Sequence, residues 1–341
     1  MEKTCFSGSV RVDLIGGTLD IYPINVVLDD VYTLNCATSL MANVEIESIQ
    51  DKKIVIESKD YGLNKEFCLD SLDSFSYSND ELGPLKFLML VVKELSPSSG
   101  LKISLYSNAP AGSGLGGSSS IGCVFFYALA KHLGLKISKN NIINIIQRIE
   151  SKILNQGPAG YQDYYPSMFG GILSLGSKMS GVIVEQLYTP ELANHLQENI
   201  TLVYSGESRD SGINNWEVYK SFFENNNEVR QGLSQIRNCS LAGLEALSNS
   251  DYEKFLNEVV EEGKIREDLF SGIMTSRMKE LKNTIKSEIK NFKGIKVCGA
   301  GGGGCFLVIC KDKLRVENLI KSSGMEVLPF EIRPPVGELN D

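Results

Sequence analysis

One stretch of the chain combines residue types that are unsuited to a packed core. It runs Pro110-Ala-Gly-Ser-Gly-Leu-Gly-Gly-Ser-Ser-Ser120, with four glycines in six consecutive positions and then three serines. Such a segment suits a loop that opens onto a helix, where several backbone N–H groups converge beside the positive end of the helix dipole. A phosphate is a natural ligand of that arrangement, so the stretch predicts an anion-binding loop.

Two common phosphate-binding loops fit this stretch poorly. A P-loop needs a lysine before its serine or threonine, and the stretch contains no lysine. A dinucleotide-binding fingerprint agrees with the spacing of Gly112, Gly114 and Gly117, but it also needs an acidic residue about 20 residues later to hold the ribose. Between the loop and Ile149 there is no Asp or Glu. A nicotinamide-dependent oxidoreductase is therefore a weak alternative.

Four further residues have the chemistry that phosphoryl transfer requires. Ser118 could bind Mg²⁺ or simply cap the following helix. Glu150 flanks an apolar stripe, where an unpaired carboxylate is costly, so we expect it to bind a metal or to pair with a neighbouring base. Asp163 lies in a loop rich in glycine, proline and aromatic residues, where it could stabilise a turn or act as a general base. Arg11 could form a structural salt bridge or stabilise the transferred phosphoryl group.

Three segments of the chain together resemble the GHMP kinases, which include galactokinases, homoserine kinases, mevalonate kinases and phosphomevalonate kinases. The N-terminal segment Arg11-Val-Asp-Leu-Ile-Gly-Gly-Thr-Leu-Asp20 is similar to the substrate motif of the family, and Gly299-Ala-Gly-Gly-Gly-Gly304 to its C-terminal glycine motif. Gly117 departs from the family pattern Pro-x-x-x-Gly-Leu-Gly-Ser-Ser, which the loop otherwise follows at Pro110, Gly114, Leu115, Gly116 and Ser118.

This resemblance implies an α+β, two-domain GHMP kinase fold: a ribosomal protein S5 domain 2-like N-terminal domain and a ferredoxin-like α/β C-terminal domain. It implies ATP and Mg²⁺ as cofactors, with Asp163 and Arg11 as catalytic residues and with Ser118 and Glu150 as metal ligands. The implied nucleotide-binding residues are Pro110, Gly112, Ser113, Gly114, Leu115, Gly116, Gly117, Ser118 and Ser119. The implied substrate-binding residues are Gly17, Thr18, Asp20, Gly301, Gly302 and Gly303.

The substrate motif points to a sugar. Gly16-Gly-Thr-Leu-Asp20 stands where galactokinases have Gly-Glu-His-Thr-Asp-Tyr, and it resembles heptose 7-phosphate kinases and fucokinases instead, as does the Gln162-Asp163 pair. We expect ATP-dependent phosphorylation of a sugar or sugar phosphate at the anomeric hydroxyl, with D-glycero-D-manno-heptose 7-phosphate as the first choice. A fucokinase-like or galactokinase-like 1-kinase and an inactive nucleotide- or sugar-binding regulator are the alternatives. Arg209 is a weaker candidate for contacting a substrate phosphate.

The hydrophobic pattern predicts the elements that position these residues. Alternation predicts strands at 44–48, 53–57 and 101–107, the last leading into the glycine loop. Helical periodicity predicts helices at 84–95, 121–133 and 138–154, and a helical region over 211–289. Further strands are expected at 171–175, 182–188, 200–204, 295–298 and 305–310. We place a domain boundary near 190, so that 1–190 carry the ATP loop, the metal ligands and Asp163, and 191–341 carry the C-terminal glycine motif.

Composition limits the classes of partner. The chain has 341 residues, 42% of them hydrophobic, and a net charge of −8, which disfavours nucleic acids and anionic membranes. Its eight cysteines include no Cys-x-x-Cys pair, as expected for reduced thiols in a reducing compartment. We see no signal peptide and no apolar run long enough to span a membrane. The expected protein is cytoplasmic, binds a small molecule, and could form a homodimer.

Overall fold

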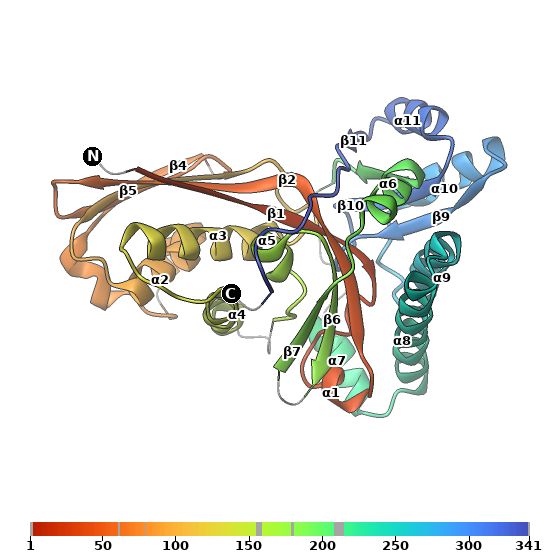
Figure 1. Ribbon diagram of the computed structural model, residues 1–341, viewed down its shortest axis with the longest axis horizontal. Coiled ribbons are helices and arrows are strands. Elements are labelled where there is room, and N and C mark those ends of the chain that lie inside the picture. The colour runs from red at the N-terminus through yellow and green to blue at the C-terminus, as the bar shows by residue number, and fades with distance from the viewer. Residues whose placement is uncertain are drawn as a thin grey trace.

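The computed structural model describes residues 3–60, 62–78, 80–154, 159–178, 181–207 and 215–339. Within these residues the named strands form two sheets, one of seven strands and one of four. Figure 1 shows the two sheets at opposite ends of an elongated molecule, with helices packed against each.

The seven-stranded sheet is built from the first half of the chain. Its order is β4-β3-β5-β2-β6-β7, with β1 paired to β2 and antiparallel to it over most of its length. The expected alternation is confirmed in the second half of β2 and in β3, where buried and partly exposed residues alternate. The strands are β1 (Lys3–Ile15), β2 (Tyr32–Ile49), β3 (Lys53–Ser58), β4 (Leu63–Cys68), β5 (Gly100–Ser107), β6 (Ile172–Lys178) and β7 (Gly181–Gln186).

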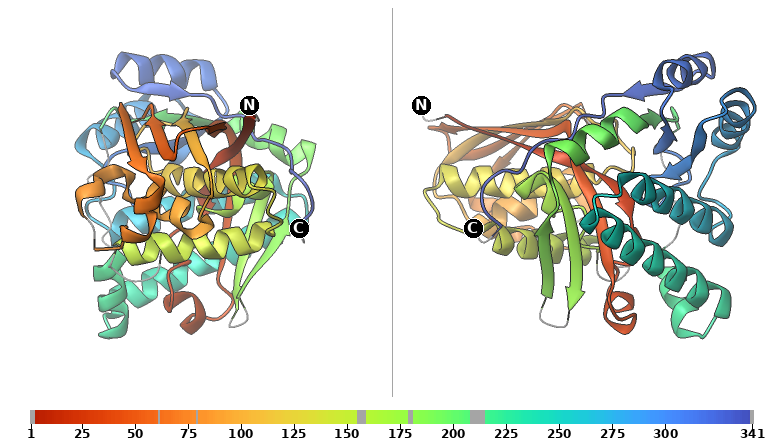
Figure 2. Two further views of the ribbon diagram at one scale, coloured as in Figure 1. Left: turned by 90° about the vertical axis from the view of Figure 1, so that its left-hand side faces the viewer. Right: turned by 45° about the vertical axis from the view of Figure 1, so that its right-hand side comes forward.

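Helices α2 (Lys86–Leu95), α3 (Gly117–His132) and α4 (Lys139–Leu154) lie on one face of this sheet, as Figures 1 and 2 both show. The middle one, α3, packs against β1 and β2 on one side and against α2 and α4 on the other. Its apolar residues, among them Val124, Phe125 and Phe126, are accordingly fully buried. The helices of this half are α1 (Ile24–Val27), α2 (Lys86–Leu95), α3 (Gly117–His132), α4 (Lys139–Leu154) and α5 (Tyr165–Phe169), with 3₁₀ helices at Leu69–Ser74 and Asp80–Leu85.

The four-stranded sheet has the order β11-β8-β10-β9, and all its pairings are antiparallel. This is the strand order of a ferredoxin-like βαββαβ unit, with several helices inserted after the first strand. The strands are β8 (Ile200–Tyr204), β9 (Phe292–Val297), β10 (Cys305–Cys310) and β11 (Glu326–Leu328). The helices are α6 (Pro190–Asn199), α7 (Asn215–Phe223), α8 (Asn227–Ser248), α9 (Tyr252–Leu269), α10 (Ser276–Glu288) and α11 (Lys313–Ser322).

The expected α+β class with two sheet-based halves is confirmed, while the boundary near residue 190 stays a prediction. The two halves are closely interleaved, because α8 and α9 contact β1 of the first sheet. The chain after β11 also returns to the first sheet, where Ile332 pairs with Thr38 and Pro335 pairs with Gly170. Figure 2 shows this C-terminal segment running back along the first half of the molecule.

The structure differs from the sequence-based prediction at several elements. Helix α3 begins at Gly117 rather than at Ile121, because the serines after the glycine loop form its first turn. Helix α2 begins at Lys86 rather than at 84, since Gly83 has a positive φ of 52° that interrupts the helix. Strand β1 was not predicted, although polar and apolar residues alternate from Ser9 to Leu14. The structure buries the side chains on both faces of this stretch.

The described residues contain no helix long and apolar enough to span a membrane. The eight cysteines are free thiols, and all but Cys5 and Cys68 are buried. The buried cysteines therefore act as small hydrophobic residues in the core.

Candidate active site

A cavity of about 460 Å³ brings the three sequence motifs together. Most of the predicted site residues line it, although they come from segments far apart in the chain: Arg11, Gly17, Thr18, Asp20, Pro110, Gly112, Ser113, Gly114, Gly116, Gly117, Ser118, Ser119, Glu150 and Asp163. Leu115 does not line it, because its side chain is fully buried beneath the loop. The volume is sufficient for a ligand of drug-like size.

The glycine loop joins β5 to the N-terminus of α3, as predicted. Gly112, Gly114 and Gly116 have φ values of 69°, 76° and 70°, a backbone region that other residue types rarely adopt. The first N–H groups of α3 have no intrahelical partner, and they lie beside the cavity at the positive end of the helix dipole. A Cβ at Gly117 would meet no atom within 4 Å, so the departure from the family serine has no steric cause.

The C-terminal glycine motif supports the glycine loop from behind. A Cβ on Gly304 would lie 2.7 Å from the carbonyl oxygen of Ser113, and one on Gly299 would lie 2.8 Å from that of Gly114. The Cys305 N–H also donates to the Ser113 carbonyl at 2.7 Å. Only glycine allows two backbones to approach this closely. Within this motif Gly299 lines the cavity. The residues expected to bind substrate, Gly301, Gly302 and Gly303, do not line it, and Gly301 packs against Ile273 instead.

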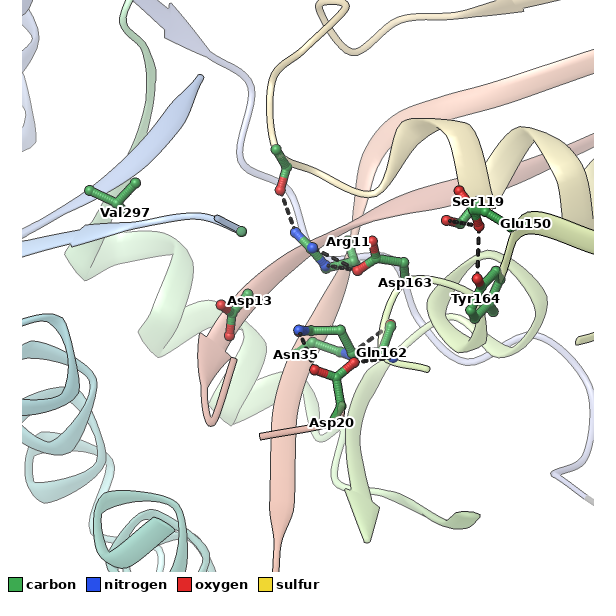
Figure 3. A network of polar contacts seen from close by, with 12 residues as sticks. Arg11, Asp13, Asp20, Asn35, Ser119, Glu150, Gln162, Asp163, Tyr164 and Val297 are labelled. Atoms are coloured by element: carbon green, nitrogen blue, oxygen red, sulfur yellow. Dashed lines mark hydrogen bonds and ion pairs between the residues drawn. The ribbon is translucent and has the colours of Figure 1, made fainter. Parts of the chain in front are cut away.

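Arg11 and Asp163 form the central ion pair of the cavity, shown in Figure 3. Nε and Nη2 of Arg11 lie 2.8 and 2.6 Å from the same oxygen, Oδ1 of Asp163. The Arg11 side chain is 4% exposed and that of Asp163 30% exposed, so the carboxylate is the member of the pair open to a ligand. Burial by itself lowers the pKa of Arg11, but the charges of Asp163 and Asp13 outweigh burial and raise it.

Asp20 forms a second polar centre with the loop that carries Asp163 (Figure 3). Its two oxygens accept from the backbone N–H of Gln162 at 3.0 Å and from the Gln162 side-chain amide at 3.2 Å. Burial raises the pKa of Asp20 to about 6, even though the backbone hydrogen bond from Gln162 lowers it. A Cβ on Gly160 would lie 2.3 Å from Asp20, which explains the glycine there.

Glu150 lies at the opposite wall of the cavity, on α4. Its Oε2 accepts from the Ser119 hydroxyl at 2.8 Å and from the Tyr164 hydroxyl at 2.7 Å (Figure 3). Burial raises the pKa of Glu150, while these two hydrogen bonds lower it in part. The alternative of pairing with a neighbouring base is not what the structure shows, since Arg148 instead contacts Glu94.

The donor set at Glu150 suits Mg²⁺ only in the presence of a phosphate ligand. Among the described residues no group of three or more His, Cys, Asp or Glu side chains could hold a metal. Mg²⁺, however, is commonly bound through one or two carboxylates, water and substrate phosphates. Glu150 and the exposed hydroxyl of Ser118 line the same cavity and offer oxygen ligands of that kind.

Several residues of the site were missed by sequence reasoning. Tyr164 holds Glu150 and Gln162 holds Asp20. The sequence reasoning used Gln162 only as part of the resemblance and gave Tyr164 no role. Asp60 lines the far end of the cavity and accepts from the Ser107 N–H with both oxygens, at 3.0 and 2.9 Å. No local pattern marks Asp60. Arg209 lies outside the described residues.

Comparisons with known proteins agree with this geometry. Residues 84–171 match the model of the GHMP kinases N terminal domain, and residues 244–322 match that of the GHMP kinases C terminal domain. The chain is 28% identical over 322 residues to the D-glycero-alpha-D-manno-heptose 7-phosphate kinase of Campylobacter jejuni, covering 92% of this chain and 91% of that protein. It is 26% identical over 315 residues to the mevalonate kinase of Pyrococcus furiosus, covering 87% and 88%.

A third relative is longer than this chain. The chain is 26% identical over 326 residues to the bifunctional fucokinase/GDP-fucose pyrophosphorylase of Arabidopsis thaliana, but the match covers 91% of this chain and only 30% of that protein. The chain thus spans less than a third of this relative.

Solved structures share the fold. A putative sugar kinase from Campylobacter jejuni has a TM-score of 0.75 at 22% identity, covering 98% of this chain and 96% of that one. The mevalonate kinase of Methanococcus jannaschii has a TM-score of 0.77 at 18% identity, covering 98% and 99%. Both family domains are matched in the expected order around one cavity, so the chain contains the N-terminal and the C-terminal domain of the GHMP kinases.

Proposed function

We propose that this chain is a kinase that transfers the γ-phosphoryl group of ATP to a hydroxyl of a sugar or sugar phosphate. The observation that carries the proposal is the Arg11–Asp163 pair, whose carboxylate is open to the cavity between the glycine loop and Asp20. The finer proposal is that the acceptor is the anomeric hydroxyl of a heptose 7-phosphate. The heptose 7-phosphate kinase and fucokinase relatives support a sugar substrate.

A polyhydroxyl acceptor also fits the chemistry around Asp20. A carboxylate accepts two hydrogen bonds from neighbouring hydroxyls readily, and Gln162 holds Asp20 in place at the cavity wall. The matches to mevalonate kinases are of similar strength, so the substrate assignment depends on this polar centre. Among the described residues that line the cavity, Arg11 is the only Lys or Arg, and it is already paired with Asp163. The substrate panel should therefore contain sugars with and without a phosphate of their own.

We propose a part in the transfer for each of these residues. The free N–H groups at the start of α3 bind the triphosphate. Oδ2 of Asp163, which has no hydrogen-bond partner among the described residues, accepts the proton of the acceptor hydroxyl as its oxygen bonds to the γ-phosphorus and ADP leaves. Arg11 orients Asp163 through its two contacts with Oδ1, which leaves Oδ2 facing the acceptor. Ser118 and Glu150 would hold Mg²⁺, which when bound neutralises charge on the β- and γ-phosphates.

The direct test is ADP release from ATP with a panel of heptoses, fucose, galactose and their phosphates, alongside mevalonate and homoserine. We expect turnover with at least one sugar or sugar phosphate. Turnover with mevalonate or homoserine alone would overturn the sugar assignment, and ATP binding without turnover on any acceptor would favour the inactive regulator.

We expect the Asp163→Asn variant to fold and bind ATP but to lose about 10²–10⁴ in kcat, because the amide cannot accept the hydroxyl proton. Steady-state kinetics with the best acceptor measures this loss, and thermal unfolding checks the fold. An unchanged kcat would exclude the general-base role.

The roles of Ser118 and Ser119 can be distinguished by how the activity of their alanine variants depends on Mg²⁺. We expect Ser118→Ala to give a folded protein with little activity that is partly recovered at high Mg²⁺, because a metal ligand is lost. We expect Ser119→Ala to act more weakly, since it removes only a hydrogen bond to Glu150. Activity as a function of Mg²⁺ concentration distinguishes them, and the reverse order of effects would move the metal role to Ser119.

The pKa of Asp20 near 6 predicts a pH-dependent sugar affinity. As the pH falls from 7 to 5 the carboxyl gains a proton and loses acceptor capacity, so KM for the sugar should rise. Because the folded pKa exceeds the unfolded one of about 4, the contribution of Asp20 to stability falls as pH rises between 4 and 6, and protonation does not unfold the protein. In Asp20→Asn we expect a higher KM that no longer changes over this range. A KM profile identical to that of the wild type would contradict the role of Asp20.

A further inference from the structure

Four charged side chains are buried together at the wall of the cavity, which Asp13 lines. Asp13, Glu262 and Lys296 are 0% exposed and Arg266 is 1% exposed. Nζ of Lys296 lies 3.1 Å from Asp13 Oδ2 and 3.0 Å from Glu262 Oε2. Arg266 Nη1 lies 3.4 Å from Asp13 Oδ2. With two acids and two bases this group, the buried cluster, is neutral as a whole when all four residues are ionised.

The charges of the buried cluster are mutually dependent. Burial by itself raises the pKa of Asp13, but Lys296 and Arg266 outweigh burial and lower it, so this carboxylate is ionised at neutral pH. Burial also raises the pKa of Glu262, and the same two cations oppose that effect only in part. Taking charges out of water costs roughly what their mutual attraction returns, so the net stabilisation from such a cluster is small. Its contribution to the protein must then be mainly geometric.

The buried cluster touches three parts of the candidate active site. Asp13 is two residues from Arg11 on β1, so both side chains lie on the same side of the strand. A Cβ on Gly17 would lie 2.3 Å from Oδ2 of Asp13, so the turn of the substrate motif packs directly on this carboxylate. On the other side, Arg266 donates to the carbonyls of Val297, at 3.2 Å, and Gly299.

We propose that Lys296, Arg266 and Glu262 are positioning residues for phosphoryl transfer, which through Asp13 and the Gly299 carbonyl hold the substrate motif and the C-terminal glycine turn in register. The inference rests on the proposed function for its kinetic part. Because Gly299 and Gly304 contact the glycine loop, a shift of this turn also changes nucleotide binding, which can be measured without any acceptor.

The first experiment separates positioning from stability. We expect Lys296→Met to lower the thermal midpoint by about 10 °C, because it leaves an uncompensated buried negative charge. The double variant Glu262→Gln/Lys296→Met restores neutrality, so we expect most of the midpoint to return while kcat/KM stays at least tenfold below wild type. Recovery of both stability and kcat/KM in the double variant would overturn the proposal, since the buried cluster would then be merely structural.

An exposed ion pair between the same two elements provides the matched control. Lys293 on β9 and Glu253 on α9 lie 2.7 Å apart, with 29% and 58% of their side chains exposed, and neither residue lines the cavity. We expect Glu253→Gln/Lys293→Met to keep wild-type kcat and KM. A loss in this control as large as in the buried double variant would also overturn the proposal.

A charge-conserving variant covers the case in which the double variant does not fold. Arg266→Lys keeps the buried cluster neutral but loses the planar fork that contacts Asp13, Val297 and Gly299 at once. We expect a folded protein with ADP affinity weakened at least fivefold by calorimetry and kcat/KM reduced at least tenfold. Unchanged ADP affinity in a folded variant would overturn the proposal. If the wild type phosphorylates no sugar, the proposed function fails, but the ADP measurement still tests this inference.

Discussion

The active site depends on the close approach of two glycine turns. The backbone of Gly299 and Gly304 lies directly against Ser113 and Gly114, at distances that leave no room for a Cβ. This contact fixes the second sheet against the loop that opens helix α3, and so the strands that carry the two turns also set the shape of the cavity. Both glycine turns contain residues with positive φ values, which glycine adopts at no steric cost.

The proposed triphosphate site lies in a protein whose net charge is −8. The cavity provides few full positive charges, and among its described lining residues Arg11 is the only Lys or Arg. Backbone N–H groups at the start of α3 and the helix dipole supply positive potential instead, and they do so with no long side chain to order. Full charges are used where orientation matters, in the Arg11–Asp163 pair and in the buried cluster.

The carboxylates of the site are distinguished by their surroundings. Asp163 is paired with a guanidinium and open to the cavity, whereas Asp20 and Glu150 are held by neutral donors in buried positions that raise their pKa. Asp13 is the extreme case, because it is fully buried and yet ionised through Lys296 and Arg266. In the proposed reaction, carboxylates therefore serve proton transfer, hydroxyl binding and metal binding, and Asp13 positions the neighbouring segments.

The sequence by itself determined the α+β class, most strands and helices, and the segments that meet at the cavity. The strands, helices and glycine loops follow from local properties of consecutive residues, whereas the α+β class and the meeting of the three motifs were implied by the resemblance to the GHMP kinases. It missed β1, although Ser9 to Leu14 alternate between polar and apolar residues. It also left open whether Glu150 binds a metal or pairs with a base, and it did not show that Ser119 and Tyr164 hold this carboxylate. Only the tertiary structure decided such partnerships. Asp13 and Lys296 are 283 residues apart, and no local pattern in either segment records that their charges meet in a place without water.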